Sequence, residues 1–97
     1  MLVELTDLAK SDIESILEYT EGRWGRKQKD KYNDLLYDAI QDVAKNPLSA
    51  YTKKVKKGKA PTRYYRVGKH HIYYVIENNK ISVTRILHGQ MNADLHL

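Results

Sequence analysis

The feature that most constrains the fold is a change of apolar period about halfway along the chain. Between residues 7 and 45, apolar residues recur three and four positions apart, which is the period of an amphipathic α-helix. Beyond "KNP" at 45–47 this pattern gives way to runs rich in β-branched and aromatic residues, namely "RYYRV", "HHIYYVIE" and "ISVTRILH". Helices followed by strands predict an α+β fold of two layers.

Two helices are expected in the first half. The first, at about 7–22, begins where Thr6 or Asp7 offers a capping oxygen, and the glycines of "GRWGRK" interrupt it. The second, at about 27–45, stops before Pro47, which lacks an N–H donor. So short a connection predicts an antiparallel hairpin, and the acidic residues on both helices are interpreted as solvated faces. The expected apolar stripes are Ala9, Ile13, Ile16, Leu17, Thr20 and Trp24 in the first helix, and Tyr32, Leu35, Leu36, Ala39, Ile40 and Val43 in the second.

The strands are expected to form one sheet. A short strand at about 2–5 precedes the helices, and an antiparallel sheet is predicted from segments near 63–67, 70–77 and 81–88, joined by "GK" and "NNK". The basic stretch "YTKKVKKGKAPT" is predicted to be a loop with room for a short strand around 53–55. The length allows a single domain over residues 1–97, in which an N-terminal strand and a helix hairpin pack on an antiparallel sheet.

Charge and composition narrow the class of protein. Seventeen Lys and Arg against twelve Asp and Glu give a net charge of +5 with neutral histidines, which favours a nucleic acid or an acidic protein segment as partner; a domain that is merely basic is the alternative. The chain has no cysteine, so disulfides and thiolate metal sites are excluded, and a reducing cytoplasm is the expected location. No apolar run approaches the roughly 18 residues of a membrane span, and "MLVEL" does not resemble a signal peptide.

Basic and aromatic residues interleave after the second helix. Rings of Tyr64 and Tyr65 next to cations predict phosphate contact and base stacking, although a solvated basic loop is an equally good interpretation. The cations concerned are Lys53, Lys54, Lys56, Lys57, Lys59, Arg63 and Arg66.

Two neighbouring histidines do not predict a metal site. His70 and His71 are adjacent on a predicted strand, so their side chains point to opposite faces. No further ligand lies at a useful spacing, and we expect neither a metal nor a cofactor. One histidine is expected to pack into the sheet and the other to face solvent.

The last predicted strand ends in Arg85 and His88. Strict alternation places Arg85 on the face of Ile81, Val83 and Leu87, where an arginine needs acceptors, the sheet edge or a bulge to re-aim it. Arg85 could bind a phosphate and His88 could act as a general acid or base. No Ser/His/Asp set, carboxylate pair or glycine-rich phosphate loop accompanies them, so no catalytic residue is assigned.

Several co-linear segments resemble a known family. "LTDLAKSDIESILEYTEGRWG", "KYNDLL", "VAKNP" and "YRVGKHHIYYVIENNKISVTRILHGQMN" are similar to the ParE branch of the RelE/ParE toxin superfamily, the toxin halves of type II toxin–antitoxin pairs. "RWG", "VGKHHIYY" and "RILHGQMN" are the most specific pieces. The fold that this resemblance implies, a helix hairpin against an antiparallel sheet, agrees with the one predicted from periodicity.

The resemblance also implies a function. RelE-like members are ribosome-dependent mRNA nucleases, whereas ParE-like members are poisons of DNA gyrase. Arg85 fits a position shared by both branches, but Gly89-Gln90-Met91 follow His88 without the tyrosine of the nucleases, which matches the ParE ending. A gyrase poison without its own catalysis is therefore expected; an mRNA endonuclease, or a degenerate toxin that only binds its antitoxin, remains the alternative. The candidate functional surface comprises Arg63, Arg66, Arg85, His88 and Met91.

The implied partner, besides gyrase, is an acidic ParD-like antitoxin with a segment that folds on the toxin, in a complex of undetermined oligomeric state. Candidate contacts are Tyr19, Trp24 and Tyr32 on the helix hairpin. For Trp24 itself, a core position between the helices is the favoured interpretation.

Overall fold

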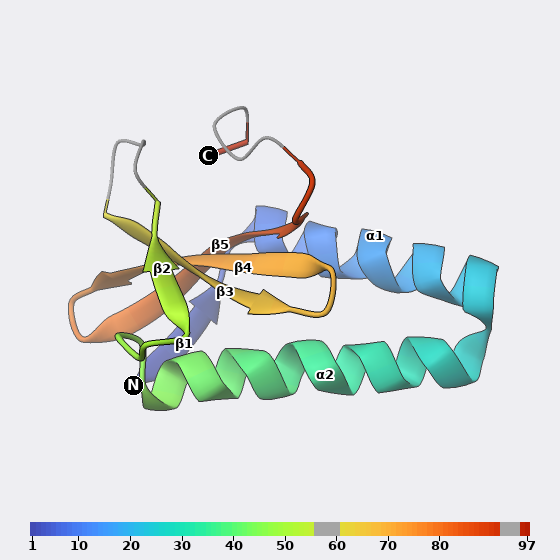
Figure 1. The fold of residues 1–97 in the computed structure, drawn as a ribbon, viewed down its shortest axis with the longest axis horizontal. Helices are drawn as coiled ribbons and strands as arrows, with labels where there is room; N and C mark the ends of the chain where they lie inside the picture. Colours follow the sequence, from blue (N-terminus) through green and yellow to red (C-terminus); the bar gives the residue numbers. More distant parts are fainter. Residues whose placement is uncertain (56–60, 92–95) are drawn as a thin grey trace.

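A hairpin of two helices covers one face of a five-stranded sheet in the computed structural model, which describes residues 1–55, 61–91 and 96–97 (Figure 1). The predicted α+β arrangement is confirmed. In chain order the elements are β1 (Leu2–Leu5), α1 (Asp7–Trp24), α2 (Arg26–Lys45), β2 (Thr52–Lys54), β3 (Thr62–Val67), β4 (His70–Glu77) and β5 (Lys80–His88).

The sheet has the strand order β1-β5-β4-β3-β2 and is mixed rather than wholly antiparallel. Strands β2 to β5 pair antiparallel, as the hairpin connections predicted. The N-terminal strand β1 joins this sheet and pairs in parallel with β5, with Leu2 opposite Lys80 and Leu5 opposite Val83. A parallel pair needs a long crossover, and the intervening helices supply it.

The first helix begins as predicted and ends later. The hydroxyl oxygen of Thr6 accepts a hydrogen bond of 3.1 Å from the backbone N–H of Ala9 and caps α1. Gly22 lies inside α1, which continues two residues past the predicted end at about residue 22. A glycine in an α-helical conformation, such as Gly22, weakens a helix by about 1 kcal/mol without ending it. The two helices are divided at Gly25, which has a φ of +92°. The second helix ends at Lys45, ahead of Pro47 as predicted.

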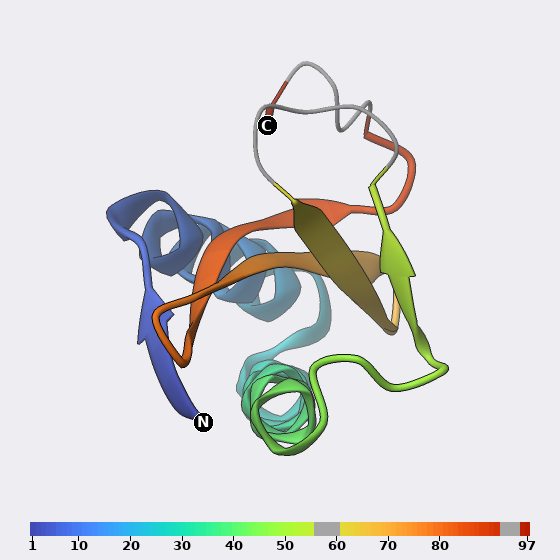
Figure 2. The same cartoon turned by 90° about the vertical axis from the view of Figure 1, so that its left-hand side faces the viewer.

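The core lies between the helix hairpin and the sheet (Figure 2). Leu36 and Ile40 of α2 and Ile13 of α1 are buried against Ile72 and Tyr74 of β4. The hydroxyl of Tyr74 donates a 2.5 Å hydrogen bond to the carbonyl oxygen of Pro47. Burial of this apolar surface is what stabilises the two layers on each other. The remaining buried members of the core are Ala9, Ala39, Val43, Ala44, Val67, Ile81, Val83 and Ile86.

The opposite face of the sheet points away from α2. His96 and Leu97, the last two residues, lie on that side in both views (Figures 1 and 2). Within the described part of the chain, no helix is long and apolar enough to cross a membrane.

Candidate functional site

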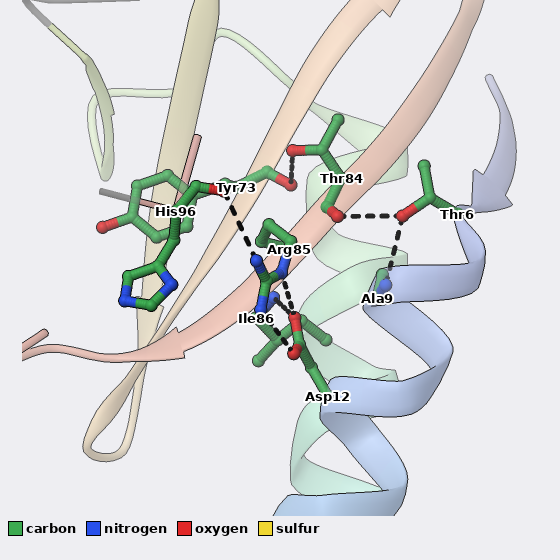
Figure 3. A network of polar contacts seen from close by, with 8 residues as sticks. All are labelled: Thr6, Ala9, Asp12, Tyr73, Thr84, Arg85, Ile86 and His96. Atoms are coloured by element: carbon green, nitrogen blue, oxygen red, sulfur yellow. Dashed lines mark hydrogen bonds and ion pairs between the residues drawn. The ribbon is translucent and has the colours of Figure 1, made fainter. Parts of the chain in front are cut away.

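A β-bulge interrupts the pairing of β4 and β5 next to Arg85. Tyr73 pairs with Arg85 and Tyr74 pairs with Val83, so Thr84 is the extra residue. The carbonyl oxygen of Thr84 accepts a 2.8 Å hydrogen bond from the hydroxyl of Thr6. The hydroxyl of Thr84 donates a 3.3 Å hydrogen bond to the carbonyl oxygen of Tyr73 (Figure 3). These contacts satisfy groups that the bulge removes from the ladder.

The bulge corrects the predicted alternation of β5. Strict alternation placed Ile86 on the face opposite Val83, but both lie in the core under the helices. An inserted residue shifts the alternation by one position, and every side chain beyond it changes face.

Arg85 is held by Asp12 of α1. Its Nε donates to Oδ2 of Asp12 at 2.8 Å and its Nη2 donates to Oδ1 at 2.9 Å (Figure 3). The side chains are only 18% and 15% exposed, and the hydrogen bond to Asp12 raises the pKa of Arg85. The third guanidinium nitrogen, Nη1, donates to the carbonyl oxygen of His96 at 3.3 Å. All three guanidinium nitrogens of Arg85 therefore have acceptors within the protein. The interpretation of the acidic helix residues as solvated is wrong for Asp12.

The candidate functional surface is not brought together in one place. Arg63 donates from Nη2 and Nε to the hydroxyl oxygen of Thr52 at 2.7 and 3.2 Å, on the side of the sheet that the helices cover. Arg66 is exposed on the other side, because residues three apart on a strand point to opposite faces. Met91 is 42% exposed after the end of β5.

A groove of about 840 Å³ lies between the helix hairpin and the β3–β4 turn. It contains the three candidate antitoxin contacts, Tyr19, Trp24 and Tyr32, together with His88. Tyr19 and Trp24 are each 65% exposed, so the favoured core position of Trp24 is wrong. The helix continues past Gly22 and carries Trp24 to its last turn, where the guanidinium carbon of Arg23 lies 5.4 Å from the ring centre. Further lining residues include Ser15, Ile16, Thr20, Gln28, Gly68, Lys69 and His70.

At the floor of this groove His70 and Tyr32 share a hydrogen bond of 2.5 Å between Nδ1 and the hydroxyl. Burial lowers the pKa of His70, and the neighbouring His88 and His71 lower it further. Burial also raises the pKa of Tyr32. Both shifts favour the neutral forms, in which Tyr32 donates when the ring proton is on Nε2.

His71 lies on the other face, as adjacency predicted, in a cluster that we call the β2–β4 cluster. Its ring stacks on Tyr64 with centres 4.7 Å apart at 21°, and its Nδ1 lies 3.4 Å from the hydroxyl of Tyr73. Burial lowers the pKa of His71, as do the nearby charges of Arg66, His88 and Lys53. Both histidines are half-buried, with His70 on the helix side of the sheet and His71 on the face away from the helices. The members of the cluster are Lys53, Tyr64, Arg66, His71 and Tyr73.

Sequence reasoning brought only part of this cluster together. It grouped Tyr65 with Tyr64, but Tyr65 packs against the helix-side core. The sequence feature that could have identified the members of the cluster is the two-residue "GK" turn. It fixes Val67 opposite His70 and therefore Arg66 opposite His71. The predicted phosphate contacts Lys56, Lys57 and Lys59 lie outside the described residues.

Metal ligation was also considered. Across residues 1–55, 61–91 and 96–97, no group of three or more His, Cys, Asp or Glu side chains is placed to hold a metal ion.

Comparison with known proteins gives one consistent family. Residues 3–93 match the model of the "ParE toxin of type II toxin-antitoxin system, parDE". Toxin ParE1 of Caulobacter vibrioides is 31% identical over 94 residues, covering 96% of this chain and 94% of the relative. Toxin ParE1 of Mycobacterium tuberculosis is 32% identical over 95 residues with the same coverage.

Solved structures agree at the level of fold. A chain of the chromosomal ParDE toxin–antitoxin system from P. aeruginosa superimposes with a TM-score of 0.80 at 12% identity, over 91% of this chain and 95% of that one. A chain of the RelBE2 toxin–antitoxin complex from Mycobacterium tuberculosis gives 0.65 at 19% identity, over 90% and 95%. Together with the sequence matches, these findings show that the chain belongs to the ParE toxin family of type II toxin–antitoxin systems.

Proposed function

We propose that this toxin is a poison of DNA gyrase that carries out no catalysis of its own and acts in the cytoplasm, where gyrase acts on DNA. The observation that carries the proposal is the state of Arg85. A nuclease would need that guanidinium to hold the scissile phosphate, but its three nitrogens already donate to Asp12 and to the carbonyl oxygen of His96.

His88 supports the same proposal. Its Nδ1 accepts a 3.1 Å hydrogen bond from the backbone N–H of Gln90, and its ring lies 5.5 Å from that of His70 in the groove. His88 therefore lines the groove, whereas Arg85 lies outside it and donates to Asp12 and to the carbonyl oxygen of His96. A phosphoryl-transfer site would need the two groups to converge on one phosphate.

A purified assay tests the proposal. Gyrase with supercoiled plasmid should accumulate cleaved DNA when the toxin is added, and ribosome-bound mRNA should stay intact under the same conditions. Cut mRNA together with unaffected gyrase would replace the proposal by the nuclease alternative. No effect on either target, with tight antitoxin binding retained, would identify a degenerate toxin.

We further propose that the groove receives a segment of an acidic ParD-like antitoxin. Tyr19 and Trp24 expose apolar ring surface there, and Arg23 and Lys69 add positive charge at its walls. An acidic segment with apolar side chains complements both features.

Calorimetric titration with the antitoxin segment tests this docking. Coupled folding onto an apolar groove should give a strongly negative heat-capacity change. Weak binding that moderate salt abolishes would mean that charge alone holds the pair and would contradict docking in the groove.

A further inference from the structure

The β2–β4 cluster places cations and aromatic rings on the sheet face that points away from the helices. Lys53 of β2 pairs with Tyr64 of β3, Tyr64 pairs with Tyr73 of β4, and Arg66 pairs with His71. Paired residues on neighbouring strands have side chains about 5 Å apart on one face. The side chains of Lys53, Tyr64, Arg66 and His71 therefore form one patch across three strands, and the buried ring of Tyr73 lies against Tyr64 and His71.

The patch has an exposed charged rim and a rigid aromatic centre. Lys53 and Arg66 are exposed, so their charged ends reach solvent. Between them the rings of Tyr64 and His71 are stacked, and the ring of Tyr64 lies 5.6 Å from that of Tyr73. Because each ring is held by the next, the platform keeps its shape before any ligand binds.

Positive charge is concentrated at this end of the sheet face. Among the described strand residues, the acidic side chains of this face are Glu4 and Glu77, which lie toward the β4–β5 turn. Glu4 is bound there by the Nζ of Lys80 at 3.0 Å. Asp12 of α1 also reaches Arg85, the partner of Tyr73, and its charge is compensated by that arginine. The patch and the acidic end of the face are thus separated along the strands.

The charges around His71 suit an anion. Burial lowers the pKa of His71 most, and Arg66, His88 and Lys53 lower it further, so the neutral imidazole is favoured. A phosphate placed between Lys53 and Arg66 would reverse this field and allow His71 to take up a proton.

We propose that the β2–β4 cluster is a direct contact site for single-stranded nucleic acid. Lys53 and Arg66 bind backbone phosphates, His71 binds a phosphate between them, and Tyr64 stacks on a base. A planar ring platform flanked by cations is the surface by which proteins hold single strands without reading their sequence. An acidic protein segment would use the cations but leave the ring platform without a matched partner. This contact requires no gyrase, so a test of nucleic-acid binding is independent of the proposed function.

Fluorescence anisotropy on the full chain tests the proposal, with a labelled DNA single strand of about 12 nucleotides. An RNA strand of the same sequence shows whether the contact distinguishes the sugar. Inorganic phosphate and polyglutamate serve as competitors. The oligonucleotide should bind, inorganic phosphate should compete weakly, and polyglutamate should compete less well than unlabelled oligonucleotide.

A charge-matched pair of variants separates the patch from general basicity. Lys53→Ala/Arg66→Ala should weaken binding about tenfold and reduce the salt slope by about 1.4, which is two phosphate contacts on a single strand. Lys27→Ala/Lys31→Ala removes the same charge from exposed positions of α2 and should change affinity less than about twofold. Equal losses in both variants would mean diffuse attraction and would overturn the proposal.

Two further measurements keep the test independent of folding. The pKa of the His71 ring, followed by NMR, should rise when the oligonucleotide binds to the wild-type chain and stay unchanged in Lys53→Ala/Arg66→Ala. Tyr64→Leu should weaken oligonucleotide binding but not phosphate binding, in a protein that melts within a few degrees of wild type. If the His71 signal does not respond to a bound oligonucleotide, the contact lies elsewhere on the protein. If polyglutamate binds as tightly as DNA, the patch is a site for acidic proteins.

Discussion

Arg85 and Asp12 meet through two parallel hydrogen bonds of 2.8 and 2.9 Å, and this contact ties the last strand to the first helix across 73 positions of sequence. The same carboxylate accepts the backbone N–H of Ile86 at 2.9 Å. Asp12 therefore satisfies both the charge of Arg85 and the first backbone donor beyond the bulge. Three charge-assisted hydrogen bonds to one carboxylate fix the direction of β5 relative to α1.

Removing this contact is expected to destabilise the fold. Arg85→Ala should lower the free energy of unfolding by about 2 kcal/mol, because it leaves a largely buried carboxylate without its cation; the value is discounted for the remaining exposure of the pair. Arg85→Lys should recover only part of the loss, since an ammonium group cannot reproduce the two-point geometry. Thermal melts should show a decrease of about 10 °C for Arg85→Ala.

The surface pair of Lys80 and Glu4 is the matched control. Its side chains are 35% and 61% exposed, so Lys80→Ala should change stability by less than about 1 kcal/mol. An Arg85→Ala protein that melts like wild type while losing toxicity would instead make Arg85 part of the target-binding surface.

The extent of sequence prediction can be judged from β5 and α1. The strand itself was predicted, because Ile81 and Val83 alternate and β-branched residues dominate. The face of Ile86 was not, since a bulge depends on tertiary contacts such as the one between Thr6 and Thr84, 78 positions apart. Periodicity also predicted that Asp12 is a surface residue, because the apolar pattern describes one helix and contains no information about the strand that packs beside that helix.

Gly68 and Gly22 provide a test of backbone conformation. Gly68 has φ of +54°, and a Cβ there would lie 2.8 Å from the hydroxyl oxygen of Tyr32, so Gly68→Ala should destabilise the protein by about 1–3 kcal/mol. Gly22 lies inside α1 with nothing within 4 Å of a Cβ, so Gly22→Ala should stabilise it by about 0.5–1 kcal/mol. Urea denaturation of both variants measures the two signs.

The steric part of the Gly68 effect can be isolated with Tyr32→Phe, which removes the nearest atom. Gly68→Ala should cost less in that background than in wild type. Additive effects would show that the strain lies in the backbone alone.

Stability is expected to fall on mild acidification. The native pKa values of His70 and His71 are lowered, so the unfolded chain, with a pKa near 6.5, binds protons that the native chain resists. Stability therefore rises with pH in this range, and it is lost as the pH falls through about 6.5 toward the lowered native values. Melting temperatures between about pH 7.5 and about pH 5.5 measure the effect.

A variant without the two rings isolates this contribution from that of the carboxylates. His70→Gln/His71→Gln should show a flatter dependence of melting temperature on pH over the same range. An unchanged slope would assign the pH dependence to other groups.

The exposure of Trp24 makes it both a probe and a test of antitoxin docking. It is the single tryptophan of the chain and is 65% exposed at the mouth of the groove, so its fluorescence should shift to shorter wavelength when an antitoxin segment covers it. Trp24→Ala should change stability by less than about 0.5 kcal/mol, because little surface is buried there on folding, yet weaken antitoxin binding by about 2 kcal/mol if the ring is an anchor.

Tyr51→Ala is the control: that side chain is 82% exposed and follows α2, away from the residues that line the groove, and its loss should leave antitoxin affinity unchanged. Fluorescence that stays constant on binding, together with equal affinities for both variants, would place the antitoxin on another surface. A shift without loss of affinity would mean that the segment covers Trp24 but draws its binding energy from Tyr19 and Tyr32, whose alanine variants would then carry the effect.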